Sequence, residues 1–181
     1  FHAAFSGKLR DLHIRAYVLE EISGQWQSRG RVGGDGLWPL QKPMKLPNGN
    51  WIMSCLRVGQ GTAAAVAISH GADFTRWDPV IIPRAPGKMW GESALLRDGD
   101  RLINIARYGE ESLALVAVSD DWGRTWTPSQ PTNLPMTTSK PYAGRLSTGQ
   151  PYLICTTASD TGTGRNPLTI AVGEPSGAAF T

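Results

Sequence analysis

A turn glycine recurs at intervals of 50 residues in this chain, at Gly49, Gly99 and Gly149. Asn-Gly and Asp-Gly, which end at the first two of these positions, favour two-residue β-hairpins because glycine adopts the positive φ that such turns need. Two apolar segments follow each turn and predict strands. They are residues 51–56 and 65–69, 101–106 and 115–119, and 152–157 and 169–173. A repeat of about 50 residues with short strands predicts an all-β fold made of blade-like sheets.

The octapeptide at residues 119–126, Ser-Asp-Asp-Trp-Gly-Arg-Thr-Trp, directly follows one of these strands. In a tight turn, Asp121 can accept hydrogen bonds from backbone N–H groups, and Gly123 can take a positive φ. Thr125 would begin the next strand, and Trp126 offers a large apolar surface between neighbouring sheets. The octapeptide therefore predicts a structural turn rather than a catalytic group. Weaker versions of it stand at residues 69–77 and 173–180.

The pattern Ser-x-Asp-x-Gly-x-Thr-Trp resembles the Asp-box, or BNR repeat, of the sialidase (neuraminidase) superfamily. This resemblance implies a sialidase-type β-propeller of about six blades, of which about three are expected here. The expected organisation is one partial propeller domain over residues 1–181, with blade-like units at about 42–90, 91–139 and 140–181. Residues 12–19 are expected to form a leading strand, although a short helix also fits their pattern. Because the chain opens with Phe1, it is interpreted as a fragment of a longer protein.

The same resemblance assigns three site residues. Glu92 precedes an innermost strand, Arg107 follows the next strand, and Arg165 lies in a later loop, in the order of the sialidase site. It implies that Arg107 and Arg165 bind the carboxylate of a terminal sialic acid, because guanidinium groups pair bidentately with carboxylates. Glu92 would be the base for a tyrosine nucleophile, which sialidases use in place of a carboxylate. The Tyr, the acid/base Asp and the first Arg are expected outside this sequence, so the fragment alone is expected to be inactive.

Other interpretations of these residues stay open. Arg57 stands eight residues after Gly49, as Arg107 stands eight after Gly99, so an arginine here can be a repeated structural feature. Glu92 and Arg165 can each be solvated surface groups. Further candidates for the same face are left out of the predicted site, since aromatic residues of a propeller more often fill the space between blades. These candidates are Trp38, Trp90 and Tyr142, with the dipeptides at residues 42–43 and 140–141.

Two rival functions share this fold, because a fold does not determine a function. One is a non-catalytic Asp-box propeller that binds glycans or proteins. The other is a different enzyme of acidic polysaccharides, such as a lyase acting on a uronate. A sialidase requires the missing Tyr, Asp and Arg, whereas a binding propeller does not.

Composition and residue spacing argue against several other classes of function. The net charge is +3, but basic residues are scattered without a run, so no nucleic-acid partner is expected. No apolar run is longer than the six residues 63–68, which is too short to cross a bilayer. The three histidines and two cysteines show no metal-ligand spacing, and no metal or cofactor is expected. Cys55 and Cys155 occupy equivalent positions two repeats apart, which predicts two buried free thiols. Only the family resemblance suggests secretion or a periplasmic location.

Overall fold

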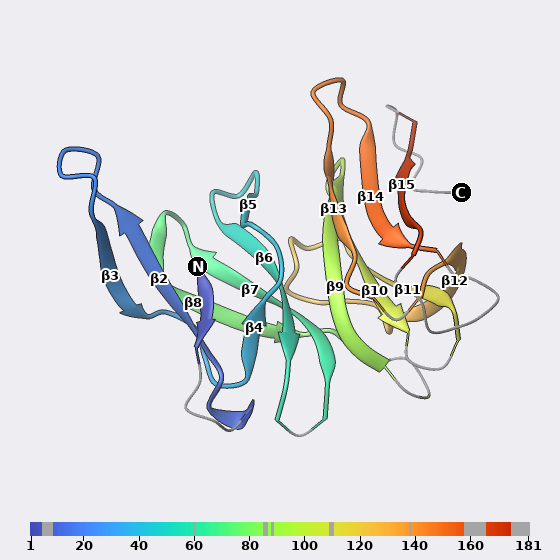
Figure 1. Cartoon of the computed structure of the whole chain (residues 1–181), viewed down its shortest axis with the longest axis horizontal. Coiled ribbons are helices and arrows are strands. Elements are labelled where there is room, and N and C mark those ends of the chain that lie inside the picture. Colours follow the sequence, from blue (N-terminus) through green and yellow to red (C-terminus); the bar gives the residue numbers. More distant parts are fainter. Residues whose placement is uncertain are drawn as a thin grey trace.

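The chain folds into antiparallel β-sheets, as a computed structural model shows (Figure 1). The structure describes residues 1–4, 9–59, 61–84, 87, 89–108, 111–137, 139–157 and 166–174. Within these ranges the helical content is one 3-10 turn at Leu9–Asp11. Four sheets, named A to D in chain order, follow one another from blue to red in Figure 1.

In each sheet the chain meanders from one edge to the other. Sheet A contains β1 (His2–Ala4), β2 (His13–Leu19) and β3 (Trp26–Arg31). Sheet B contains β4 (Leu37–Pro39), β5 (Met44–Lys45), β6 (Trp51–Arg57), β7 (Ala63–His70) and β8 (Asp73–Ile81). Sheet C contains β9 (Met89–Asp98), β10 (Arg101–Tyr108), β11 (Leu113–Ser119) and β12 (Gln130–Pro135). Sheet D contains β13 (Tyr142–Arg145), β14 (Pro151–Thr156) and β15 (Leu168–Val172).

The strands and turns predicted from the repeat are confirmed. Gly49, Gly99 and Gly149 all have positive φ, at 88°, 57° and 87°, and each precedes a strand of a different sheet. The six predicted strands correspond to β6 and β7, β10 and β11, and β14 and β15. Residues 13–19 form strand β2, so the helical alternative for this segment is wrong.

Each pair of neighbouring sheets encloses its own apolar core, as expected when blades stack side by side. Ile52 of sheet B and Leu102 of sheet C are buried in one core with Trp126. Cys55 lies in the core between sheets A and B, and Cys155 lies in the core between sheets C and D. Both cysteines are free and buried, as predicted, and burial raises the pKa of both thiols.

The octapeptide forms a closed hydrogen-bonded turn at the end of β11. The Ser119 hydroxyl accepts the N–H of Gly123 at 2.9 Å, and Asp121 accepts both the N–H and the hydroxyl of Thr125, at 2.9 and 2.6 Å. The indole of Trp126 donates to the carbonyl of Gly123 at 2.9 Å and enters the core between sheets B and C. The box is therefore a structural turn, as the sequence predicts.

The weak box at residues 69–77 keeps part of this geometry. Trp77 is buried, and its indole donates to the carbonyl three residues earlier, at Phe74, at 3.1 Å. Asp73 accepts the N–H and the hydroxyl of Thr75. The tryptophan wedge and the aspartate turn thus survive although the order of Asp and Gly has changed. In the third box, at residues 173–180, all but the first two residues lie outside the described residues.

The charge on Asp121 should stabilise the fold in a pH-dependent way. Partial burial opposes its ionisation, but hydrogen bonds from Thr125 and Ser119 outweigh this effect and lower its pKa below the usual 3.8. A lowered folded-state pKa stabilises the protein above pH 3.8, and this stabilisation is lost as the pH falls through the lower value. We expect Asp121→Asn to reduce the free energy of unfolding at pH 7 by about 1–2 kcal/mol, with a smaller loss at pH 3.

Urea unfolding of both proteins at the two pH values measures this difference. Asp120→Asn is the matched control, because Asp120 is exposed and pairs only at the surface with Arg101, at 2.8 Å. An equal loss at both pH values for Asp121→Asn would assign the effect to turn geometry instead of charge.

Candidate functional site

Glu92 and Arg107 form an ion pair at one end of sheet C. Glu92 lies near the start of β9 and Arg107 near the end of β10, beside the pairing of Ser93 with Ala106. Their side chains meet with 2.9 Å between Arg107 Nη1 and Glu92 Oε2. The Asp-box and the Gly99 hairpin lie at the other end of the sheet, because Leu102 pairs with Ser119 there. The pair is therefore remote from the residues that specify the blade turn.

The ring of Trp90 lies against the guanidinium of this arginine. The Arg107 guanidinium carbon lies 4.8 Å from the centre of the Trp90 ring, which is a cation–π contact. The side chain of Arg107 is 10% exposed and that of Glu92 is 24% exposed, so both are shielded but reachable from one side. An arginine held by an ion pair and an aromatic face is preorganised to bind a planar anion.

A cleft of about 470 Å³ opens in front of this pair. Trp90, Glu92 and Arg107 line its side on sheet C, and Trp38 and Leu56 line its side on sheet B. Trp38 and Trp90 are 40% and 49% exposed, unlike the buried Trp77 and Trp126. We call this cleft the Glu92 cleft. Its walls are mostly apolar and carry one acidic side chain, Glu92, and one basic side chain, Arg107, a composition typical of small-molecule sites.

A buried polar cluster behind the cleft holds β9 against sheet B. The Ser54 hydroxyl of β6 donates to the carbonyl of Ser93 at 2.7 Å, and the Asn104 amide donates to the Ser93 hydroxyl at 2.9 Å. The Thr62 hydroxyl donates to the carbonyl of Met89 at 2.8 Å. The bonds at Met89 and Ser93 lie on either side of Glu92 along β9, and they fix the position of β9 relative to sheet B. No local sequence pattern identifies them, since their partners are up to 39 residues apart.

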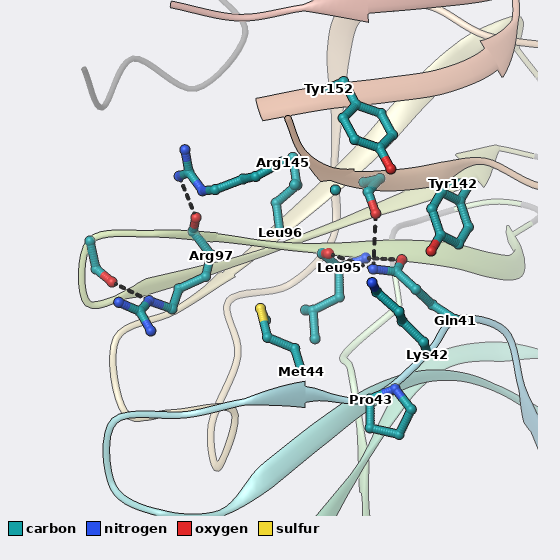
Figure 2. A pocket seen from close by; sticks show the side chains of 13 residues that line it. Gln41, Lys42, Pro43, Met44, Leu95, Leu96, Arg97, Tyr142, Arg145 and Tyr152 are labelled. Carbon is teal, nitrogen blue, oxygen red and sulfur yellow. Dashed lines mark hydrogen bonds between the residues drawn. The ribbon is translucent and has the colours of Figure 1, made fainter. Parts of the chain in front are cut away.

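Two of the three predicted site residues can be located in the structure. It brings Glu92 and Arg107 together, whereas Arg165 lies outside the described residues. Arg57 has the same spacing as Arg107 from its hairpin but donates to the backbone carbonyl of Asp35. Trp38 and Trp90, which the sequence prediction left out, line the cleft. Tyr142 and the dipeptide at residues 42–43 line a different cavity, shown in Figure 2.

Over the described ranges, no three His, Cys, Asp or Glu residues come together in a way that could hold a metal ion. The part of the chain that the structure describes also contains no helix with the length and apolar character needed to cross a membrane.

The meandering sheets, the stacked cores and the Asp-box together define a sialidase-type β-propeller fold. The family model for the BNR repeat-like domain matches residues 25–181, and the chain belongs to this family. The fold class predicted from the sequence is thus confirmed. A sequence comparison with curated proteins gave no match.

Solved structures with the same fold include a protein of unknown function, a sialidase and an arabinanase. A protein of unknown function from Dyadobacter fermentans DSM 18053 aligns over 96% of this chain and 55% of its own, with a TM-score of 0.62 and 16% identity. The NanB sialidase from Streptococcus pneumoniae aligns over 89% of this chain and 26% of its own, with a TM-score of 0.61 and 15% identity. An α-L-arabinanase from Penicillium chrysogenum aligns over 88% and 53%, with a TM-score of 0.57 and 18% identity. This chain thus spans about half or less of the length of these three proteins, and at such identities the likeness describes the fold alone.

Proposed function

We propose that this chain carries part of the active site of a sialidase-like glycoside hydrolase, which releases a terminal acidic sugar from glycans. The observation that carries the proposal is the Glu92–Arg107 ion pair in the wall of a cleft that Trp38 and Trp90 also line. The fold supports a carbohydrate substrate in general, and this pair supports an acidic sugar in particular.

Arg107 would bind the carboxylate of the substrate. Its guanidinium has five N–H donors in a planar fork, and Glu92 faces the Nη1 end of that fork. A carboxylate entering the cleft can use donors on the cleft side while the ring of Trp90 supports the guanidinium plane. Arg165 would be a second cation of the same clamp, as the family resemblance implies. The exposed faces of Trp38 and Trp90 would contact the apolar face of the sugar ring.

Glu92 would act as a general base. A carboxylate nucleophile would be repelled by the negative charge of the substrate, and sialidases use a tyrosine instead. A phenol is a weak nucleophile at neutral pH, so a neighbouring carboxylate must take its proton as the oxygen attacks the anomeric carbon. The leaving alcohol would receive its proton from an aspartic acid, and water would later release the sugar with retained configuration. The tyrosine and the aspartic acid would both come from sequence outside this chain.

Arg107→Ala tests the clamp in the protein expressed from the complete reading frame that encodes this chain. Loss of one charge-assisted pair should raise KM for a simple sialoside about 10- to 100-fold. Free sialic acid released from sialyllactose measures the rate. Arg57→Ala is the matched control, because Arg57 has the same strand position in sheet B but faces a backbone carbonyl. It should leave KM within about threefold of the wild-type value.

Two outcomes would contradict the proposal. A KM unchanged by Arg107→Ala would remove this residue from substrate binding. If the folded wild-type protein released no sialic acid but bound an acidic glycan, the function would be that of a binding propeller or of another enzyme of acidic polysaccharides.

A further inference from the structure

A second cavity lies between the inner strands of sheets B, C and D, away from the Glu92 cleft. It has a volume of about 460 Å³ and is lined by residues 41–44, 95–97 and 142–145, with Gly99 and Tyr152 (Figure 2). Arg97 marks its position along β9, because this residue pairs with Leu102 near the hairpin end of the sheet. We call it the inner-strand cavity. The two cavities have no lining residue in common and lie toward opposite ends of β9.

Gln41 ties the three walls of the inner-strand cavity together. Its side-chain amide donates to the carbonyls of Leu95 and Ala143, at 3.1 and 3.0 Å, and its oxygen accepts the N–H of Leu95 at 3.1 Å. This side chain, from the connection between β4 and β5, thus holds the edge strands β9 and β13 in fixed positions, and Figure 2 shows its hydrogen bonds as dashed lines. The cavity is therefore preorganised, which lowers the entropic cost of binding a ligand.

Basic groups outnumber acids around this cavity. Lys42, Arg97 and Arg145 line it. Arg145 donates to the carbonyls of Gly149 and Arg97, both at 2.6 Å, and lies 3.6 Å from the carboxylate of Asp98. Lys42 is exposed and forms no ion pair with any residue that the structure describes. Arg97 donates through Nε to the carbonyl of Gly99 at 2.9 Å. With three cations and one carboxylate near the cavity, the local potential is positive and favours an anionic ligand.

Two tyrosines supply the remaining wall. Tyr142 and Tyr152 are partly buried, and Figure 2 shows both rings bordering the cavity on the side of sheet D. The ring of Tyr152 lies directly over Gly144, where an added Cβ would be 2.6 Å from the phenol oxygen. Gly144 thus leaves the space that the ring occupies. Aromatic faces beside hydrogen-bonding groups suit a sugar ring, and the volume lies within the range of small-ligand sites.

We propose that the inner-strand cavity is a second, non-catalytic site that binds an anionic saccharide. Lys42 would bind a carboxylate or sulfate of the sugar, and Tyr142, which lies on the same side of the cavity in Figure 2, would contact its ring. This site is independent of the chemistry proposed for Glu92 and Arg107. It would hold a second acidic unit of a glycan chain, or a separate acidic glycan, on another face of the same domain.

Calorimetric titration of the protein with digalacturonic acid tests this proposal, with galactobiose as the neutral disaccharide and sodium sulfate as the anion alone. We expect digalacturonate to bind at least tenfold more tightly than either control ligand. Lys42→Gln should weaken that binding about tenfold, because one charge-assisted hydrogen bond is lost. Lys45→Gln is the matched control, since Lys45 is exposed on β5 but does not line the cavity. Tyr142→Leu should also weaken binding, whereas Arg107→Ala should leave it unchanged.

Each alternative outcome overturns a defined part of the proposal. Equal affinity for digalacturonate and galactobiose would exclude recognition by charge, and equal affinity for digalacturonate and sulfate would exclude recognition of a sugar. Equal effects of Lys42→Gln and Lys45→Gln, or no binding by a protein with native circular dichroism, would exclude the site. Loss of binding in Arg107→Ala would place the ligand in the Glu92 cleft instead. Sialic acid release by Lys42→Gln, measured in parallel, keeps this result separate from the fate of the hydrolase proposal.

Discussion

Glu92→Gln should lower kcat for a sialoside by a factor of about 10² to 10⁴, while KM stays within about threefold of the wild-type value. Glutamine has the size of glutamate, and its amide oxygen can still accept the bond from Arg107 Nη1, which spans 2.9 Å in the wild-type protein. It cannot take a proton from a phenol at neutral pH. Arg107 should therefore still bind the substrate carboxylate while the proposed base is lost, so that kcat falls and KM changes little. Initial rates of sialic acid release, over a range of sialyllactose concentrations, measure both constants.

Glu111→Gln is the matched control for this experiment. Glu111 is exposed in the connection between β10 and β11 and does not line the cleft. It should keep wild-type kcat. Near-normal turnover in Glu92→Gln would remove Glu92 from the mechanism and leave its ion pair with Arg107 as a structural contact. Comparison with Arg107→Ala, for which a rise in KM is expected, then distinguishes a base from a binding residue.

Local chemistry explains why so much of the fold was predictable from the sequence. The hairpins at Gly49 and Gly99 are specified by adjacent residues, and the strand after each hairpin shows as a short apolar run. The Asp-box is equally local, because the bonds of Ser119, Asp121 and Trp126 reach no more than four residues along the chain. Such features need no knowledge of the tertiary structure.

The site depends on pairing between distant strands, and this limited its prediction. Counted from the hairpins, Arg57 and Arg107 are equivalent, but the strand register gives them different partners. Arg57 pairs with Leu37 across the strands, so no carboxylate faces it from β4. Arg107 lies at an irregularity in the pairing of β10 with β9, and its side chain contacts Glu92 of β9 there. In sheet B, strand β5 lies between the inner strand β4 and the Gly49 turn, whereas in sheet C the inner strand β9 leads directly into the Gly99 turn. Counting residues from the turns therefore could not show that Arg57 and Arg107 have different partners.

The aromatic residues show the same limit. Trp77 and Trp126 follow their turns and enter the cores between sheets, whereas Trp38 and Trp90 lie on inner strands and face the cleft. A tryptophan alone predicts only a large apolar surface. Its strand, and the end of the strand on which it stands, decide whether that surface fills a core or faces a ligand. The hydrogen bonds from the Gln41 side chain to Leu95 and Ala143 are harder still to predict, because these partners are 54 and 102 residues away.

Gly91→Ala should reduce the free energy of unfolding by about 3 kcal/mol or more. Gly91 has a φ of 88°, and an added Cβ would lie 2.4 Å from the carbonyl carbon of Ala63 and 2.6 Å from the N of Ala64. These are backbone atoms, so no side-chain rotation can relieve the contact. β9 would have to move away from β7, and Trp90 and Glu92 would move with it.

Gly49→Ala separates the two causes of this expected loss. Gly49 has the same φ of 88°, but an added Cβ there would meet nothing within 4 Å. It should therefore lose only the cost of a positive φ, about 1 kcal/mol. Urea unfolding of both variants measures the difference, which is the cost of the close approach between β9 and β7. A loss in Gly91→Ala no larger than that in Gly49→Ala would mean that the two strands can separate freely. In that case the walls of the Glu92 cleft would not be held at a fixed distance, and the preorganised arginine on which the proposed clamp depends would lose its support.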